Sequence, residues 1–186
     1  PRHFDTLSLI ATILAQTERV RVFPDVANLA LRPPLMLAKA GATLDVLSHG
    51  RFELGLGSGA FWEGVAAMGG PRLSPADAVQ SVAEAIPLLR AYWRGERSVR
   101  FNGEIYQARG AHPGPLPLHD IRIWLGVSGP RMLKLTGQAA DGWIPSMSYI
   151  SPAKAAQLNA IIDTAAVAAG RPPSAIRRIY NVPGAF

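Results

Sequence analysis

The chain has 186 residues and a formal net charge of +6, from 19 basic and 13 acidic side chains. Its 48% hydrophobic and 17% charged residues are enough to form a packed core, which excludes a disordered chain or a coiled coil. The lack of cysteine excludes disulfides, thiolate metal sites and cysteine nucleophiles. The length predicts one domain, or part of a larger single-domain fold.

The basic side chains are spread along the chain, and no basic stretch is interleaved with aromatic residues. The charge therefore does not indicate nucleic-acid binding. No apolar run reaches the ~18 residues needed to cross a bilayer. The first twenty residues contain Asp5 and lack a small-residue cleavage site, so they do not resemble a secretory signal. We therefore expect a cytoplasmic protein that binds neither nucleic acid nor membranes.

Helical and extended patterns alternate in the first half of the chain. Periodicity predicts helices over residues 5–17, 33–47 and 74–93, and strands over 20–26 and 52–57. Asp5 and Ser74 are the expected N-cap residues of the first and third helices. Pro87 lies inside the third helix and should kink it.

Residues 97–120 interrupt this alternation. Phe101 and Ile105 flank an Asn102-Gly103 pair, a strong hairpin signal, and a stretch rich in proline and glycine follows. We expect an insertion here, within a single domain that covers residues 1–186. The alternation then resumes, with strands predicted over 121–127, 142–145 and 177–182, and helices over 130–139 and 151–170.

Five strands separated by helices predict parallel βαβ units and an α/β fold. The apolar strand at 123–127 indicates burial on both faces of the sheet. Two architectures fit: a small open doubly wound sheet, or part of an eight-stranded barrel. Because a complete barrel typically needs about 250 residues, the length alone favours the open sheet.

Residues 55–60, with the sequence GLGSGA, match the loose dinucleotide-binding pattern G-x-G-x-x-G/A. That pattern also requires a tight turn into a helix and an acidic residue after the next strand, whereas Pro71 follows here and Asp77 falls in a predicted helix. The alternative is a glycine-rich strand end that packs closely in the core. Three apolar residues beyond it could wall a ring-shaped ligand: Phe61, Trp62 and Met68.

Ser128-Gly129-Pro130-Arg131 lies between a buried strand and a predicted helix. Unpaired amides at the helix start, the serine hydroxyl and the arginine fork could hold a phosphate. An ordinary N-cap followed by a solvated arginine explains the same residues. Asp141-Gly142-Trp143 similarly indicates a turn before a buried tryptophan.

The four histidines do not indicate a metal site, because they lie in turns, in a loop and near the terminus, without a helical H-x-x-x-H pair or neighbouring carboxylates at ligand spacing. A G-x-S-x-G elbow and a Walker lysine are also missing from the sequence. Nucleophilic hydrolysis and P-loop chemistry therefore have no support.

Three segments in order, residues 42–59, 124–131 and 140–143, resemble the bacterial luciferase-like monooxygenases and the related deazaflavin-dependent oxidoreductases. The resemblance covers nearly the whole chain. It implies a (β/α)8 TIM barrel that binds FMN or the 5-deazaflavin coenzyme F420 at the carboxyl ends of its strands, often as a homodimer. It would place the chain between the second helix and about the seventh strand, an incomplete barrel with about strands 3 to 7. It therefore reverses the preference for an open sheet.

The resemblance also implies roles for individual residues. Asp25 and Val26 would form a strand bulge that supports the flavin ring. In several deazaflavin enzymes this bulge carries a non-prolyl cis peptide. Asn28 would lie just beyond the bulge. Ser58 and Gly59 would flank the cofactor. The cofactor phosphate would be held by a second set of residues: Ser128, Gly129, Arg131 and Met132. Ser146 would face the substrate.

Two departures from the family pattern concern the substrate. Ala60 replaces an acidic residue of the sugar-phosphate dehydrogenases, and Tyr149 replaces their phosphate-binding lysine. The resemblance implies an oxidoreductase or monooxygenase acting on a small organic substrate, with its catalytic residues unassigned. The alternatives are a non-catalytic or degenerate flavin-binding barrel and a Rossmann-type nucleotide-binding protein.

Overall fold

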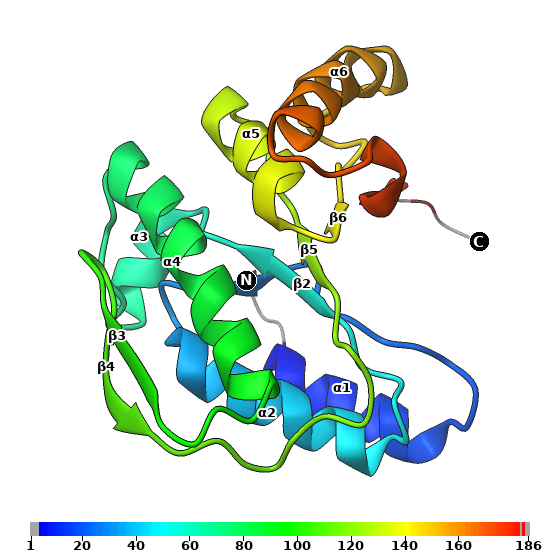
Figure 1. The fold of residues 1–186 in the computed structure, drawn as a ribbon. Helices are drawn as coiled ribbons and strands as arrows, with labels where there is room; N and C mark the ends of the chain where they lie inside the picture. Colours follow the sequence, from blue (N-terminus) through cyan, green and yellow to red (C-terminus); the bar gives the residue numbers. More distant parts are fainter. Residues whose placement is uncertain (1–3, 183, 185–186) are drawn as a thin grey trace.

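The computed structural model describes residues 4–182 and residue 184. Its helices are α1 (Thr6–Gln16), α2 (Pro34–Leu47), α3 (Trp62–Ala67), α4 (Pro75–Trp93), α5 (Pro130–Ala139), α6 (Pro152–Ala168) and the short 3-10 helix η1 (Pro173–Ala175). Its strands are β1 (Ala27–Asn28), β2 (Leu54–Gly57), β3 (Val99–Asn102), β4 (Gln107–Ala111), β5 (Ile123–Leu125), β6 (Gly142–Trp143) and β7 (Arg177–Arg178). Figure 1 shows how these elements are arranged.

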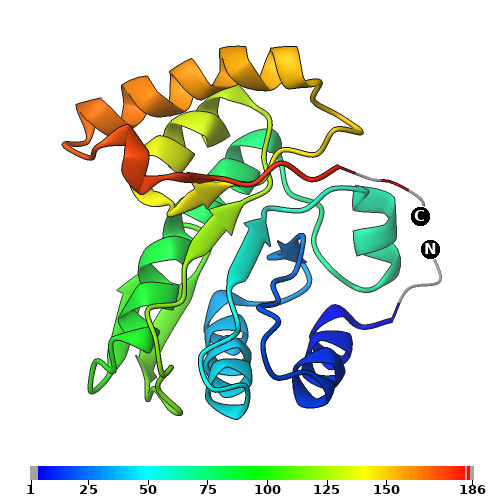
Figure 2. The ribbon, with the colours of Figure 1, turned by 90° about the vertical axis from the view of Figure 1, so that its right-hand side faces the viewer.

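The main sheet is an arc of a barrel. Its strands are all parallel, and their order in space, β1-β2-β5-β6-β7, is their order in the chain. A doubly wound sheet would reverse direction at a switch point, so the open sheet favoured by length alone is wrong. Figure 2 shows α1 and α2 below the strands, α4 to their left, and α5 and α6 above them, whereas α3 lies to the right. The expected parallel barrel arc is confirmed.

The two faces of the sheet differ in side-chain size. Leu54, Leu56, Ile123 and Leu125 are fully buried in the core between the sheet and the helices. The residues that alternate with them include glycines, which face the inside of the arc. The helical layer therefore holds the core, and the inner face has room near the backbone.

Local signals predicted the helix boundaries well. The Asp5 carboxylate accepts a hydrogen bond from the Ser8 amide, and the Ser74 hydroxyl accepts one from the Asp77 amide. Pro87 lies inside α4 as expected. The strands are shorter than predicted because only a few residues of each run pair with a neighbour. The apolar loop expected after residue 60 is also partly wrong, because it contains helix α3.

The polar residues around 45–53 lie at the end of the sheet where the strands begin. Asp45, which is fully buried, accepts hydrogen bonds from the amides of Leu118 and His119. His119 Nδ1 lies 2.8 Å from Asp45 Oδ1, and Nε2 lies 3.4 Å from Glu53 Oε1. The expectation that the histidines have no neighbouring carboxylates is thus wrong for His119, because its partners are distant in sequence. Among the described residues, no His, Asp and Glu group is arranged to hold a metal.

Arg51 connects three segments at this same end. Its guanidinium donates to the carbonyl oxygens of Leu14, Val20 and Ser48 at 2.8, 3.1 and 2.7 Å. These bonds satisfy acceptors at the ends of α1 and α2 that would otherwise lack partners. Much of the segment that carries the family resemblance therefore stabilises the fold.

The hairpin of β3 and β4 covers the outer side of α4 (Figure 1). Its turn is held by Glu84 of α4, whose carboxylate accepts from the amides of Glu104, Ile105 and Tyr106 at 2.7, 3.1 and 2.9 Å. Burial, the largest influence, would raise the pKa of Glu84, but the bonds from these amides and from Gln80 bring it below its usual value. Sequence patterns gave no signal for this contact.

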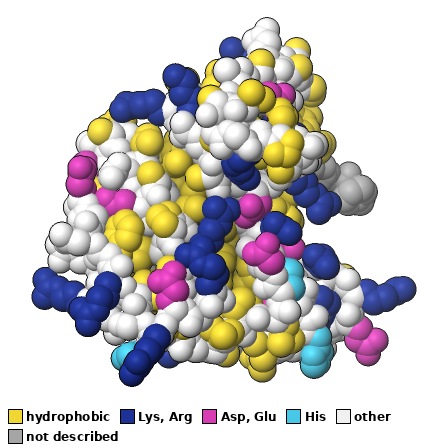
Figure 3. Space-filling view, in the orientation of Figure 1, with side chains coloured by type: hydrophobic (Ala, Val, Ile, Leu, Met, Phe, Trp, Pro, Cys, Tyr) yellow, Lys and Arg dark blue, Asp and Glu magenta, His cyan; other side chains and the backbone are white. Residues whose placement is uncertain are grey.

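Surface charge is dispersed in the structure as in the sequence. On the face shown in Figure 3, Lys and Arg side chains are interspersed with Asp, Glu and apolar groups. Within residues 4–182, no helix is long and apolar enough to cross a bilayer.

Candidate functional site

Most of the predicted site residues follow the carboxyl ends of neighbouring strands. The registers between β2, β5 and β6, continued past the strand ends, place Gly59, Ser128 and Ser146 at one level. Ser146 forms a parallel bridge with Asn181 beyond β7. We call residues 25–28, 58–60, 128–131, 146–147 and 181 the rim.

The chain bulges just before β1. Val22 pairs with Phe52 and Ala27 pairs with Leu56, so the first segment has one more residue between its pairs than the second. The Asp25-Val26 peptide bond within this bulge is cis. The expectation of a bulge or a cis peptide at this position is confirmed.

Glycines of the neighbouring strands make room for the bulge. A Cβ at Gly55 would lie 2.0 Å from the Pro24 carbonyl oxygen. A Cβ at Gly57 or Gly126 would lie 2.8 or 2.6 Å from a methyl group of Val26. The chain itself thus occupies the space beside Gly55 and Gly57, which supports close packing over the dinucleotide-binding interpretation.

Gly59 turns the chain at the rim, with a φ of +121° that favours glycine. A Cβ there would lie 3.0 Å from both Asn28 Oδ1 and the Trp62 ring. The same Asn28 oxygen accepts a hydrogen bond from the Ala30 amide at 2.9 Å. The structure therefore brings Asn28, Gly59 and Trp62 together at one corner of the rim. Trp62 was expected near a ligand, but its place beside Asn28 had no local signal.

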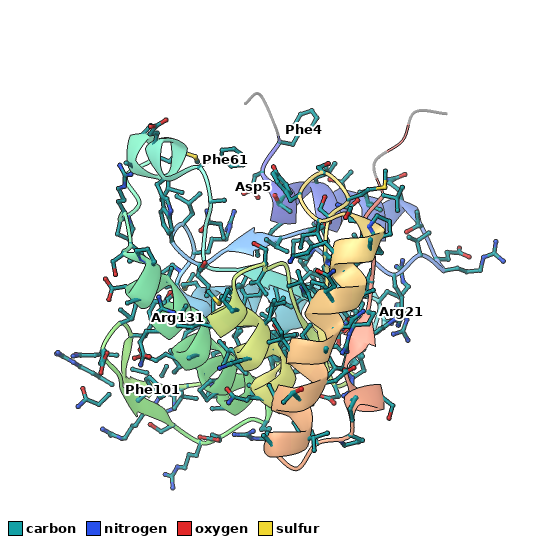
Figure 4. The ribbon with its side chains drawn as sticks, turned by 90° about the horizontal axis from the view of Figure 1, so that it is seen from above. Phe4, Asp5, Arg21, Phe61, Phe101 and Arg131 are labelled. Carbon is teal, nitrogen blue, oxygen red and sulfur yellow. The ribbon has the colours of Figure 1, made fainter. Side chains whose placement is uncertain are left out.

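The start of α5 opens onto the rim. Gly129 is its N-cap and supplies no side chain, and nothing lies within 4 Å of a Cβ added to it. Arg131 is exposed and makes no ion pair with a described acidic residue (Figure 4). Met132 differs, since its side chain is buried in the core and only its amide is directed to the helix start. Free amides and an arginine fork here suit an anion.

Asp25 joins the two edges of the arc. Its Oδ2 accepts a hydrogen bond from Asn181 Nδ2 at 2.7 Å, although 156 residues separate the two. Asp25 is exposed at the rim. The surrounding protein nevertheless desolvates its carboxyl group and raises its pKa, and the hydrogen bond from Asn181 opposes that rise. Asn181 had no signal of a site residue in the sequence, because it lies in a run predicted as regular strand.

An apolar edge lies beside the rim. Phe61 has a left-handed φ of +54°, and its side chain is 79% exposed. Figure 4 shows it projecting from its loop into the open space between α3 and the start of α1, where Phe4 and Asp5 lie. An exposed aromatic ring in this position can cover an apolar ligand at the rim.

Comparison with known proteins gives a consistent picture. The model of a family described as luciferase-like monooxygenase matches residues 1–185. The F420-dependent glucose-6-phosphate dehydrogenase of Nocardia farcinica is 30% identical over 179 residues, 95% of this chain and 53% of that protein. The phthiodiolone/phenolphthiodiolone dimycocerosates ketoreductase of Mycobacterium tuberculosis is 32% identical over 170 residues, 85% of this chain and 41% of that protein.

Solved structures share the fold. The coenzyme F420 dependent tetrahydromethanopterin reductase of Methanopyrus kandleri superposes with a TM-score of 0.84 at 22% identity, over 96% of this chain and 54% of that one. A riboflavin lyase with modified FMN gives 0.85 at 19% identity, over 97% and 44%. The chain spans about half the length of the relatives that it matches.

Proposed function

This chain belongs to the luciferase-like monooxygenase family, and from that premise we propose that it forms the cofactor-binding part of a flavin- or deazaflavin-dependent oxidoreductase. The proposed reaction is hydride transfer to or from a small organic substrate. The observation that carries the proposal is the gathering of four separate loops on one rim, at the strand ends where barrel enzymes bind their ligands.

The residues present fit such a cofactor. Ser128, Gly129 and Arg131, with the amide of Met132, would hold its phosphate, because the helix start lacks a side-chain cap. The ring would lie against the residues of the bulge and the corner beside it: Asp25, Val26, Asn28, Ser58 and Gly59. Ser146 would face the substrate. When bound, the cofactor would supply the ring atom that accepts or donates hydride, and the chain would bind the cofactor, orient it and shield it from water.

We favour F420 over FMN, because the relatives of 30% identity or more include F420-dependent dehydrogenases from Nocardia farcinica and Beutenbergia cavernae. We do not propose their sugar-phosphate substrate, since Ala60 and Tyr149 replace the residues that the resemblance implies for it. A hydroxyl or carbonyl compound without a phosphate is the proposed substrate class. The exposed Phe61 beside the rim supports an apolar compound.

Arg131→Ala is expected to weaken cofactor binding by about 1.5–3 kcal/mol, the range for a hydrogen bond to a charged group. This is about a ten- to hundredfold rise in Kd. The whole protein would be titrated with FMN and separately with F420, with fluorescence as the readout. Arg100→Ala, an exposed arginine on the hairpin, is the matched control and should bind normally.

Equal affinity of wild type and Arg131→Ala would dismiss the phosphate role of this loop. Failure of the wild type to bind either cofactor would favour the alternative of a degenerate barrel. Binding of a nicotinamide dinucleotide in their place would favour the Rossmann-type alternative.

We further propose that the whole protein is cytoplasmic, as expected from the sequence, and that it forms a homodimer, as the family resemblance implies. Sedimentation equilibrium of the whole protein should give twice the mass of one copy. A mass of one copy would contradict the dimer.

A further inference from the structure

We propose that Phe23 and Trp124 are positioning residues, which hold the bulge at Asp25-Val26 where a flavin or deazaflavin ring would rest. This inference rests on the proposed function and adds two residues to it, neither of which needs to touch the cofactor. The two side chains form an aromatic pair on the inner face of the arc, deeper than the rim.

Trp124 lies in the middle of β5 and faces the inside of the arc. The registers place it in one row with Gly55, Gly142 and Arg177, on β2, β6 and β7. Its two neighbours in β5 are fully buried on the helical side of the sheet, so alternation directs the indole inwards. Only 6% of Trp124 is exposed, although it faces the open side of the arc. Neighbouring groups on this face therefore cover the ring.

Gly142 leaves room for the indole on one side. A Cβ at this glycine would lie 2.7 Å from Trp124 Cδ1. On the next strand, the guanidinium carbon of Arg177 lies 5.7 Å from the centroid of the Trp124 ring, within the range of a cation–π contact. The glycine of the Asp141-Gly142-Trp143 motif, which the proposed function does not use, therefore fixes the place of a second tryptophan.

Phe23 contacts the indole from the segment that leads into the bulge. The two ring centroids are 4.8 Å apart and the ring planes make an angle of 78°, an edge-to-face arrangement. Phe23 is followed directly by Pro24, which has a fixed φ and restricts the backbone of the residue before it. A displacement of the Phe23 ring therefore passes along the backbone to Asp25, with few torsions to absorb it.

The bulge thus has two side-chain anchors on the wall of the arc. Toward the rim, the Val26 methyl groups lie against Gly57 and Gly126. Deeper in the arc, Phe23 lies against Trp124. Two anchors at different depths resist tilting of the segment, whereas one leaves it free to rotate about a single contact. A misplacement of about 1 Å can cost about a hundredfold in rate, so the deeper anchor matters to a cofactor ring that rests on the bulge.

The experiment separates binding of the ring from binding of the phosphate in the whole protein. FMN and F420 are each titrated by fluorescence beside their phosphate-free forms, riboflavin and the deazaflavin ribityl chromophore. Trp124→Leu keeps an apolar side chain but removes the aromatic face that Phe23 contacts. It should raise the Kd of a cofactor and of its phosphate-free form by the same factor, about three- to tenfold, the size expected for one aromatic pair. Arg131→Ala should weaken only the phosphate-bearing form.

Two further variants test the pair itself. Phe23→Leu should have the same effect as Trp124→Leu, and the double variant should bind no more weakly than the weaker single one, because the same contact is lost in all three. Trp124→Phe retains an aromatic face and should restore most of the affinity. At saturation, the circular dichroism of the bound ring should change in Trp124→Leu and return toward wild type in Trp124→Phe.

Trp93→Leu is the matched control for a loss of stability alone. Trp93 is a buried tryptophan of α4, and its Nε1 donates to the Ala38 carbonyl oxygen at 3.0 Å within the helical layer. Its replacement should lower the melting temperature, as Trp124→Leu does, and leave the Kd of both forms unchanged.

The outcomes separate this inference from the proposed function. No binding of either cofactor by the wild type overturns the proposed function, and the positioning role falls with it. If the wild type binds, unchanged affinity in a folded Trp124→Leu overturns the positioning role alone, and so does a weakening confined to the phosphate-bearing form. If Trp124→Leu does not fold, Phe23→Leu, which leaves the buried indole in place, decides by the same two criteria. Parallel weakening of both forms, with Trp93→Leu unaffected, supports both proposals.

Discussion

Replacing Glu84 by alanine is expected to lower the free energy of unfolding by about 3–5 kcal/mol, because three backbone amides of the hairpin turn lose a charged acceptor at once. Gly103 permits this close approach, since a Cβ there would lie 2.2 Å from Glu84 Oε2. Urea unfolding of the whole protein at neutral pH measures the loss. A loss below about 1 kcal/mol would show that the turn does not depend on the carboxylate.

The same residue should make stability depend on pH. The folded-state pKa of Glu84 is lowered, so its contribution is present above the unfolded value of about 4.3 and is lost as the pH falls through the folded value. Glu84→Gln should be less stable than wild type at neutral pH, and the difference should shrink in acid. Glu96→Gln, at an exposed carboxylate, is the control and should leave the pH profile unchanged.

Gly55→Ala is the second change with a large expected effect. The new Cβ would lie 2.0 Å from the Pro24 carbonyl oxygen, which is backbone and must shift as a whole. We expect a loss of about 3 kcal/mol in unfolding free energy, at the upper end of overpacking effects. Because the bulge at Asp25 moves with Pro24, cofactor affinity should fall by more than about tenfold, the effect of losing about 1.4 kcal/mol.

Gly64→Ala provides the control for Gly55→Ala. Gly64 lies in α3, and nothing is within 4 Å of a Cβ added there. Alanine in this helix should be neutral or more stable by roughly 0.5–1 kcal/mol. Thermal unfolding and cofactor titration of both variants separate the two sites. Normal cofactor binding by a folded Gly55→Ala would contradict the dependence of the rim on this close contact.

The features that were predicted correctly from the sequence are those that depend on residues close to each other in the chain. The bounds of α5 and the caps at Asp5 and Ser74 depend on residues within one helical turn, and they agree with the structure. Strand lengths were overestimated because pairing depends on what lies beside each run, and apolar character continues past the last paired residue. The hairpin was expected, but Asn102 pairs with Gln107, so its turn is longer than Asn102-Gly103 alone suggested.

The candidate site shows the same division. The glycines near β2 stand out in the sequence, but their purpose becomes clear only when Pro24 and Val26 are seen against them. The place of His119 between Asp45 and Glu53 also depends on contacts across about seventy residues. The resemblance located the bulge at Asp25-Val26, whereas the Asn181 partner had no local signal at all.

The bond between Asp25 and Asn181 has a consequence for the order in which the molecule is made. The two residues are 156 positions apart. At about 5–20 residues per second, the ribosome adds Asn181 roughly 8–30 s after Asp25. By then α1, α2 and β2 have long been synthesised, and their contacts span far shorter loops. The core can therefore begin to assemble during translation, before the bond between Asp25 and Asn181 connects the two edges of the arc.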